Sequence, residues 1–146
     1  MRTLNPVNPA TVLLMLALGA TPMLISWAAD APKTKGASHV ETITGSSLKR
    51  VVLTQKAAER LDIKTGAVTA DAAGALSTPY ASVLYDVKGN TWVYTNPEPL
   101  VYVRHAITVL SVKGPLALLK TGPAAGTAVV VVGASELYGA ESGVGH

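Results

Sequence analysis

The hydrophobic pattern divides the chain into an apolar start, a polar stretch and a series of short apolar runs. Residues Ala10–Ala29 carry no charged side chain, and Arg2 is the only charged side chain before Asp30. A basic start, an apolar stretch and a small-residue end are typical of a secretory signal. Because Ser26-Trp27-Ala28 fits the small-x-small cleavage rule, we expect residues 1–28 to form an apolar helix that serves as a signal peptide.

A membrane anchor is the alternative for the same run. About 20 apolar residues are close to the minimum length that spans a bilayer, so residues 10–29 would then hold an uncleaved chain in the membrane. Pro22 and Ser26 interrupt the later half of the run, which favours the signal peptide. Under either interpretation the rest of the chain is exported to the periplasm or the cell envelope.

Small and polar residues follow the apolar run. Pro32, Gly36 and Gly45 occur there without a hydrophobic period, so we interpret residues 29–47 as a flexible linker. Residues 48–146 are then a single domain. Its first part predicts a strand at Val51–Leu53, and Thr54 suits the N-cap of a short helix. The helix is expected over Gln55–Leu61, and the next strands over Ile63–Val68, Tyr80–Tyr85, Thr91–Thr95, Val101–Val112, Leu116–Leu119 and Thr127–Val132.

Turn signals set the connections between these runs. The segment Asp86–Asn90, with Gly89 in it, predicts a hairpin, whereas Pro97 and Pro99 predict a loop because proline cannot donate to a strand ladder. Gly133–Gly139 is expected to form one helical turn, followed by a loose end at Ala140–His146. Strands of about five residues with frequent turns predict a mainly β fold. We expect a small sandwich or barrel of about six to eight short strands, with one short helix near its start.

Composition narrows the possible chemistry. The chain has 146 residues and no cysteine, which excludes disulfides, thiolate metal sites, a cysteine nucleophile and a lipoprotein anchor. Its net charge is +3 with only 14% charged residues, and the basic residues are scattered. A nucleic-acid-binding protein normally concentrates them on one face, so we expect no nucleic-acid partner.

No group of residues predicts catalysis or a cofactor. The three histidines are far apart in sequence and do not have metal-ligand spacing, and the methionines all lie in the first 23 residues. Glu98, Glu136 and Glu141 lack a nearby motif, so charged surface positions are the default for them. We therefore expect no enzyme, no metal, no cofactor and no small-molecule substrate. The three histidines are His39, His105 and His146, and the three methionines are Met1, Met15 and Met23.

Three aromatic residues are the candidate binding residues. Trp92, Tyr94 and Tyr102 alternate with valines along predicted strands, which places aromatic side chains on one strand face. Such residues either form a protein interface or cover a hydrophobic core, and the second arrangement is the commoner one. Both interpretations remain open from the sequence.

Three segments resemble a known family. The segment VVLTQKAAERLDIKT (Val51–Thr65) is similar to the start of the membrane-proximal domain of periplasmic adaptor subunits, or membrane fusion proteins, of resistance-nodulation-division efflux pumps. The segment PYASVLYDVKGNTWVYT (Pro79–Thr95) resembles the strand pair that re-enters that domain, and GASELYGAE (Gly133–Glu141) resembles the family's C-terminal signature. Adaptors place a β-barrel, a lipoyl-like domain and a helical hairpin between the first two segments. Here only Thr69–Thr78 connects them.

The resemblance implies a role in transmembrane transport without catalysis. An adaptor-like domain is expected to dock on an inner-membrane efflux transporter or another envelope protein, through an exposed strand edge or an aromatic face. Without the helical hairpin it would not reach an outer-membrane channel. The alternative is a structural or vestigial shortened adaptor with no pump partner.

Overall fold

The computed structural model describes residues 36–143. The expected signal peptide or anchor, the first part of the expected linker and the last three residues lie outside this range. Within it, no helix combines the length and the apolarity needed to cross a membrane.

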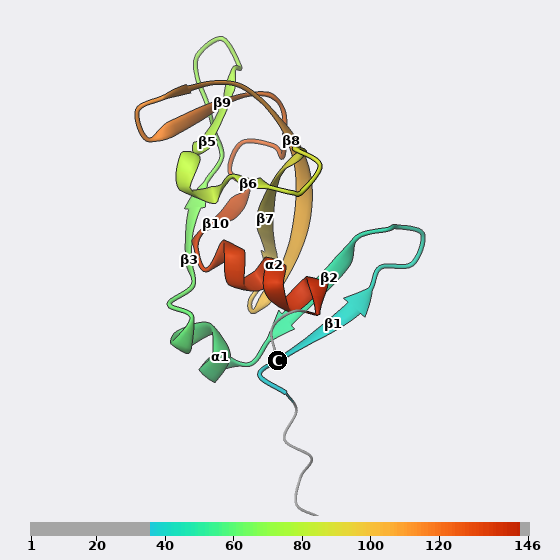
Figure 1. Cartoon of the computed structure of the whole chain (residues 1–146). Coiled ribbons are helices and arrows are strands. Elements are labelled where there is room, and N and C mark those ends of the chain that lie inside the picture. Colours follow the sequence, from blue (N-terminus) through green and yellow to red (C-terminus); the bar gives the residue numbers. More distant parts are fainter. Residues whose placement is uncertain (1–35, 144–146) are drawn as a thin grey trace, which may run out of the picture. The chain divides into compact units, whose positions relative to one another are not determined.

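Seven antiparallel strands form a barrel-like sheet (Figure 1), which confirms the expected mainly β class. The sheet is nearly closed, because its first and sixth strands approach each other. A Cβ placed on Gly66 of the first strand would lie 3.0 Å from the Pro79 ring of the sixth. In order across the sheet the strands are β3 (Lys64–Ala67), β10 (Ala128–Val132), β7 (Thr91–Glu98), β8 (Val101–Lys113), β9 (Leu116–Thr121), β5 (Leu76–Pro79) and β4 (Thr69–Ala70).

The strand β8 is the longest, and it belongs to both halves of the barrel. Its first half pairs with β7, from Val101 opposite Glu98 to Ile107 opposite Thr91. Its second half pairs with β9, and two irregularities in register lie within residues 108–111. Such bulges bend a strand and increase its twist, which lets β8 turn from one half of the barrel to the other.

A separate hairpin extends the sheet at β8. It consists of β1 (Ser38–Thr42) and β2 (Lys49–Leu53), and β2 pairs with β8. The interpretation of residues 29–47 as a linker is therefore wrong for the part that forms β1. This strand is exposed along most of its length. An edge strand of this kind lacks the alternation by which buried strands are recognised.

The short helix α1 (Gln55–Arg60) begins as predicted. The Thr54 hydroxyl accepts a hydrogen bond from the Ala57 backbone N–H at 3.2 Å, and Ala57 is buried. The strand expected at Ile63–Val68 is present as β3, with slightly shorter bounds.

The C-terminal helix α2 (Ala134–Ser142) is longer than the single turn that was expected. Gly133 and Gly143 bound it, both with a left-handed backbone. The prediction of a loose end from Ala140 is wrong up to Gly143, because Glu141 is buried. In a sequence, a charged residue near the chain end normally indicates a solvated tail. Glu141 is buried here because Tyr94 and Arg104 pair with its carboxylate.

Two further predictions differ from the structure around β7. The segment Tyr80–Tyr85 is not one strand but a 3₁₀ turn (η1, Tyr80–Ser82) followed by β6 (Leu84–Tyr85). Pro97 lies within β7 and not in a loop. The register shifts between Thr95 and Glu98, so Pro97 sits at an irregularity where no ladder donor is needed.

The hairpin between β6 and β7 is confirmed. Leu84 pairs with Trp92, and Gly89 has a φ of +81° in the turn. The Asp86 carboxylate organises this turn by accepting from the backbone N–H groups of Lys88 and Asn90 and from the Asn90 side chain. The hydrogen bond from the Asn90 side chain lowers the pKa of Asp86 to about 2.

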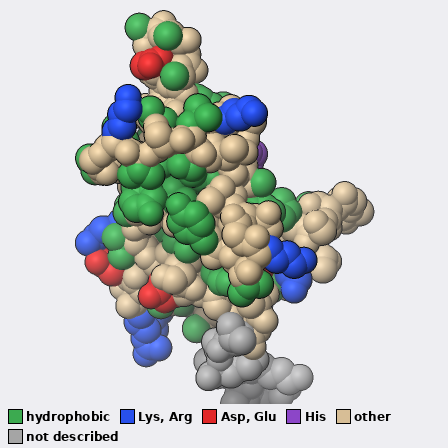
Figure 2. All heavy atoms as spheres, turned by 45° about the horizontal axis from the view of Figure 1, so that its top comes forward, with side chains coloured by type: hydrophobic (Ala, Val, Ile, Leu, Met, Phe, Trp, Pro, Cys, Tyr) green, Lys and Arg blue, Asp and Glu red, His purple; other side chains and the backbone are tan. Residues whose placement is uncertain are grey.

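Two hydrophobic clusters fill the domain. One lies between the barrel and the helices and contains Tyr94, Tyr102 and Leu137. The other lies inside the opposite half of the barrel and contains Val93, Ile107 and Leu119. Hydrophobic side chains also remain on the surface, and Figure 2 shows many of them gathered on one face, with Lys or Arg side chains on both sides.

Candidate docking groove

The three candidate aromatic residues do not form an exposed face. Tyr94 is fully buried and Tyr102 is 4% exposed, so both belong to the core. Trp92 is half-buried, and the Arg104 guanidinium lies 4.8 Å from the centre of its ring. The interpretation that aromatic residues cover the hydrophobic core is therefore correct for Tyr94 and Tyr102. The alternative, that they form an exposed docking face, is wrong for these two residues.

A buried polar network holds α2 against the barrel. The Tyr94 hydroxyl donates to Glu141 Oε2 at 2.5 Å, and Arg104 Nε lies 2.8 Å from the same oxygen. The Arg104 guanidinium also lies 5.4 Å from the centre of the Tyr138 ring, so two aromatic rings flank it. A buried carboxylate requires such partners, because an unpaired one loses its hydration without compensation. The network therefore fixes the end of α2 relative to β7 and β8.

Removing the Tyr94 hydroxyl tests this network. Burial raises the pKa of Tyr94 well above its ordinary value of 10.0, and the hydrogen bond to Glu141 raises it further. Because the unfolded chain releases this proton above about pH 10 and the folded chain does not, the stabilisation is complete below that pH and is lost as pH rises above it. We expect Tyr94→Phe to lower the free energy of unfolding by about 1–2 kcal/mol at neutral pH.

The alkaline limb separates this effect from simple loss of packing. Above about pH 10, the stability of Tyr94→Phe should fall less steeply than that of the wild type, by about 1.4 kcal/mol per pH unit. Urea denaturation at neutral pH and at about pH 11 measures both effects. Tyr85→Phe is the matched control, because Tyr85 is 56% exposed and should leave neutral stability unchanged. Parallel alkaline limbs for Tyr94→Phe and the wild type would contradict the burial of this phenol.

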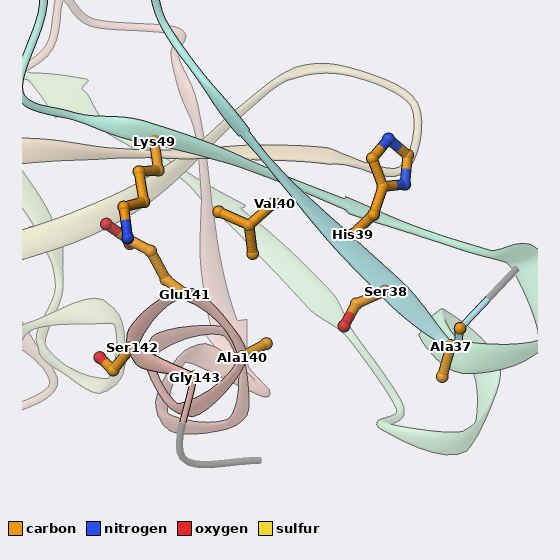
Figure 3. Close-up of a pocket in the computed structure, with 10 residues that line it drawn as sticks. Ala37, Ser38, His39, Val40, Lys49, Ala140, Glu141, Ser142 and Gly143 are labelled. Carbon is orange, nitrogen blue, oxygen red and sulfur yellow. The ribbon is translucent and has the colours of Figure 1, made fainter. Parts of the chain in front are cut away.

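The docked end of α2 forms one wall of a groove, and β1 forms the other (Figure 3). The groove has a volume of about 510 Å³. Lys49 of β2 also lines it, and Figure 3 shows its side chain extending toward Glu141. On the β1 side, the lining residues are Gly36, Ala37, Ser38, His39 and Val40.

An apolar groove of about 330 Å³ adjoins the first one. Ala37, Ser38 and Ala140 line both, so the two form a continuous surface, here called the β1 groove. Leu53, Ala57 and Leu61 make the floor of the apolar part, and Arg60 and Glu136 stand at its rim.

One backbone edge of β1 faces away from its partner strand. Thr54 N donates to Ala37 O, and Ile43 N donates to Leu48 O, so the odd-numbered residues between them point their backbone groups toward β2. Because these groups alternate in direction along an antiparallel strand, the N–H and C=O of Val40 point to the opposite side. This edge has no strand partner within residues 36–143.

The other polar residues singled out from the sequence stay apart. His39 contacts Glu41 at 2.9 Å, whereas His105, Glu98 and Glu136 are exposed. Residues 36–143 contain no group of three or more His, Asp or Glu that could hold a metal ion. Trp92 donates to Asp86 at 3.2 Å in addition to stacking on Arg104.

The pairing of Arg104 with Glu141 could not be predicted from the sequence. These residues lie 37 positions apart, and neither forms part of a motif. The sequence signal for part of this network was the alternation of Trp92 and Tyr94, which placed both side chains on one face of a strand. In the structure, these residues lie opposite Ala106 and Arg104 of β8. A comparison with protein-family models, curated proteins and solved structures finds no match to this chain.

Proposed function

We propose that this chain is a non-enzymatic extracytoplasmic binding module related to efflux-pump adaptors. It docks on a membrane transporter or another envelope protein, and it transports nothing by itself. The open edge of β1 beside an apolar groove carries this proposal, because an extended segment of a partner can add to such an edge by main-chain hydrogen bonds.

The placement of the adaptor-like segments supports the relationship. Val51–Thr65 supplies part of β2, all of α1 and the start of β3, and Gly133–Glu141 supplies most of α2. These parts pack together, since Leu53, Ala57 and Leu137 share one hydrophobic cluster. The short connection Thr69–Thr78 contains the paired strands β4 and β5, so a few residues are enough to join the two halves.

The chemistry of the β1 groove suits a peptide segment of a protein. Its backbone edge can form hydrogen bonds with the main chain of a partner, whatever the partner's sequence. The neighbouring apolar floor at Leu53 and Leu61 can accept the partner's side chains. Arg60 and Glu136 at the rim are of opposite sign. Rim charges of this kind favour one orientation of the bound segment.

Proline at residue 40 tests docking through the edge. In Val40→Pro the outward N–H is lost, while the hydrogen bonds between β1 and β2 come from the neighbouring residues. With a photo-crosslinking residue at Thr42 of the full chain, we expect the wild type to capture an envelope protein in cells. Val40→Pro should weaken that capture about tenfold, which corresponds to about 1.4 kcal/mol.

The matched control is Val40→Thr, which keeps the backbone N–H and the branched side chain. Both variants should melt close to the wild-type temperature, since residue 40 is 38% exposed. Equal capture by Val40→Pro and Val40→Thr would contradict edge docking. If the wild type captures no envelope protein, the vestigial alternative replaces this proposal.

A further inference from the structure

The hairpin formed by β8 and β9 exposes aliphatic side chains near its turn. Leu110 is 65% exposed, Val112 46% and Leu116 41%. Tyr80 lies beside the same turn, because its backbone N–H donates to Pro115 O at 2.8 Å, and its side chain is 42% exposed. These four residues, Leu110, Val112, Leu116 and Tyr80, are here called the hairpin patch.

The side chains of the hairpin patch do not belong to the buried core of the hairpin. On β9 the inward side chains Ala117 and Leu119 are buried, and Leu116 points to the other face of the strand. Because Val112 lies opposite Ala117 and Lys113 lies opposite Leu116, the exposed aliphatic side chains occupy both faces of the hairpin end. Exposed aliphatic residues that cluster in this way mark a surface that contacts another apolar phase or molecule.

The charged side chains of the hairpin itself beside the patch are basic. Lys113 lies in the register opposite Leu116, and Lys120 lies further along β9; both are exposed. No Asp or Glu occurs between Glu98 and Glu136, so β8, β9 and β10 carry no acidic residue. A second copy of the chain would bring the same lysines together, which disfavours self-association through this face.

From this combination we infer that the hairpin patch binds an anionic lipid surface. Aliphatic side chains enter the acyl boundary, tyrosine lies at the level of the headgroups, and lysines pair with lipid phosphates. Each lysine near such a surface contributes about 1 kcal/mol, or about fivefold in binding. This inference does not rest on docking by the β1 groove, which uses β1 and α2.

A tyrosine pair extends the patch along the surface. Tyr85 is 56% exposed, and the neighbouring Tyr80 side chain raises its pKa. The amphipathic ring of tyrosine is suited to the boundary between headgroups and water. Tyr80 and Tyr85 therefore mark the level at which the hairpin would meet the headgroups.

A single introduced cysteine reports on this surface, because the chain has none of its own. We would label Val112→Cys in the full chain with an environment-sensitive dye and add vesicles of equimolar phosphatidylcholine and phosphatidylglycerol. The dye should shift its emission to the blue and be quenched by brominated lipid. Thr44→Cys is the matched control in the turn after β1, and its dye should show neither change.

The charge dependence completes the test. In K113Q/K120Q, the ratio of inserted to free dye at residue 112 should fall about 25-fold, and vesicles of phosphatidylcholine alone should give a similar loss. Leu110→Cys serves as a second position if Val112→Cys does not fold. Unchanged emission at both positions, or equal quenching at residues 44 and 112, would overturn the inference. A blue shift of the dye on adding an acidic protein, with no shift on adding vesicles, would overturn lipid binding in favour of a protein partner.

Discussion

Replacing Arg104 by Ala is expected to lower the free energy of unfolding by about 3–5 kcal/mol. The substitution leaves the Glu141 carboxylate buried, with the Tyr94 hydroxyl as its remaining hydrogen-bond partner. It also removes the guanidinium from between the Trp92 and Tyr138 rings. Urea denaturation followed by circular dichroism measures the change.

The matched control removes both charges together. In Arg104→Met with Glu141→Leu, no buried charge remains unpaired, and hydrophobic side chains of similar size fill the space. We expect this double variant to recover most of the loss, because an apolar replacement of a buried ion pair is often neutral. A loss below about 1 kcal/mol in Arg104→Ala alone would indicate that water reaches Glu141 and screens it.

The second large effect is expected at the start of α2. Gly133 has a φ of +88°, and a Cβ placed there would clash with the Ile63 side chain. Gly133→Ala therefore combines backbone strain of about 1–2 kcal/mol with forced repacking of about 1–3 kcal/mol. We expect a total loss of about 2–5 kcal/mol in the free energy of unfolding.

Gly143 provides a control at the other end of the same helix. It has a φ of +74°, but a Cβ there would meet nothing within 4 Å. Gly143→Ala should therefore show the backbone strain alone, and the difference between the two variants measures the clash at Ile63. Equal losses in urea denaturation would show that Ile63 moves aside without cost.

The sequence predicted those elements whose signals are local. The Thr54 cap, the Asp86–Asn90 turn and the hairpin at Leu116 each depend on residues within a few positions of one another, and each is present. The strand β1 was missed because an exposed edge strand needs no apolar alternation. In the segment Tyr80–Tyr85, which divides into a turn and a short strand, the Tyr80 N–H donates to the carbonyl of Pro115, which lies far away in sequence.

The candidate site was predictable only in part. The alternation at Trp92 and Tyr94 correctly placed two aromatic residues on one strand face, but it could not show whether that face meets solvent or a helix. The answer depends on Glu141, which pairs with Arg104 across the domain. Such long-range charge pairs leave no trace in the spacing of a single sequence.

The strand β8 has a consequence for how the domain unfolds. It contributes Tyr102 to one hydrophobic cluster and Ile107 to the other, and its ladders join β2, β7 and β9. The backbone of β8 connects the two clusters, since its ladder with β7 ends at Ile107 and its ladder with β9 begins at Thr108. Opening of either half therefore removes one of the neighbours of β8, so we expect the two clusters to form a single cooperative unit whose last amides to exchange with solvent lie where β8 pairs regularly with β7, at residues 103–107.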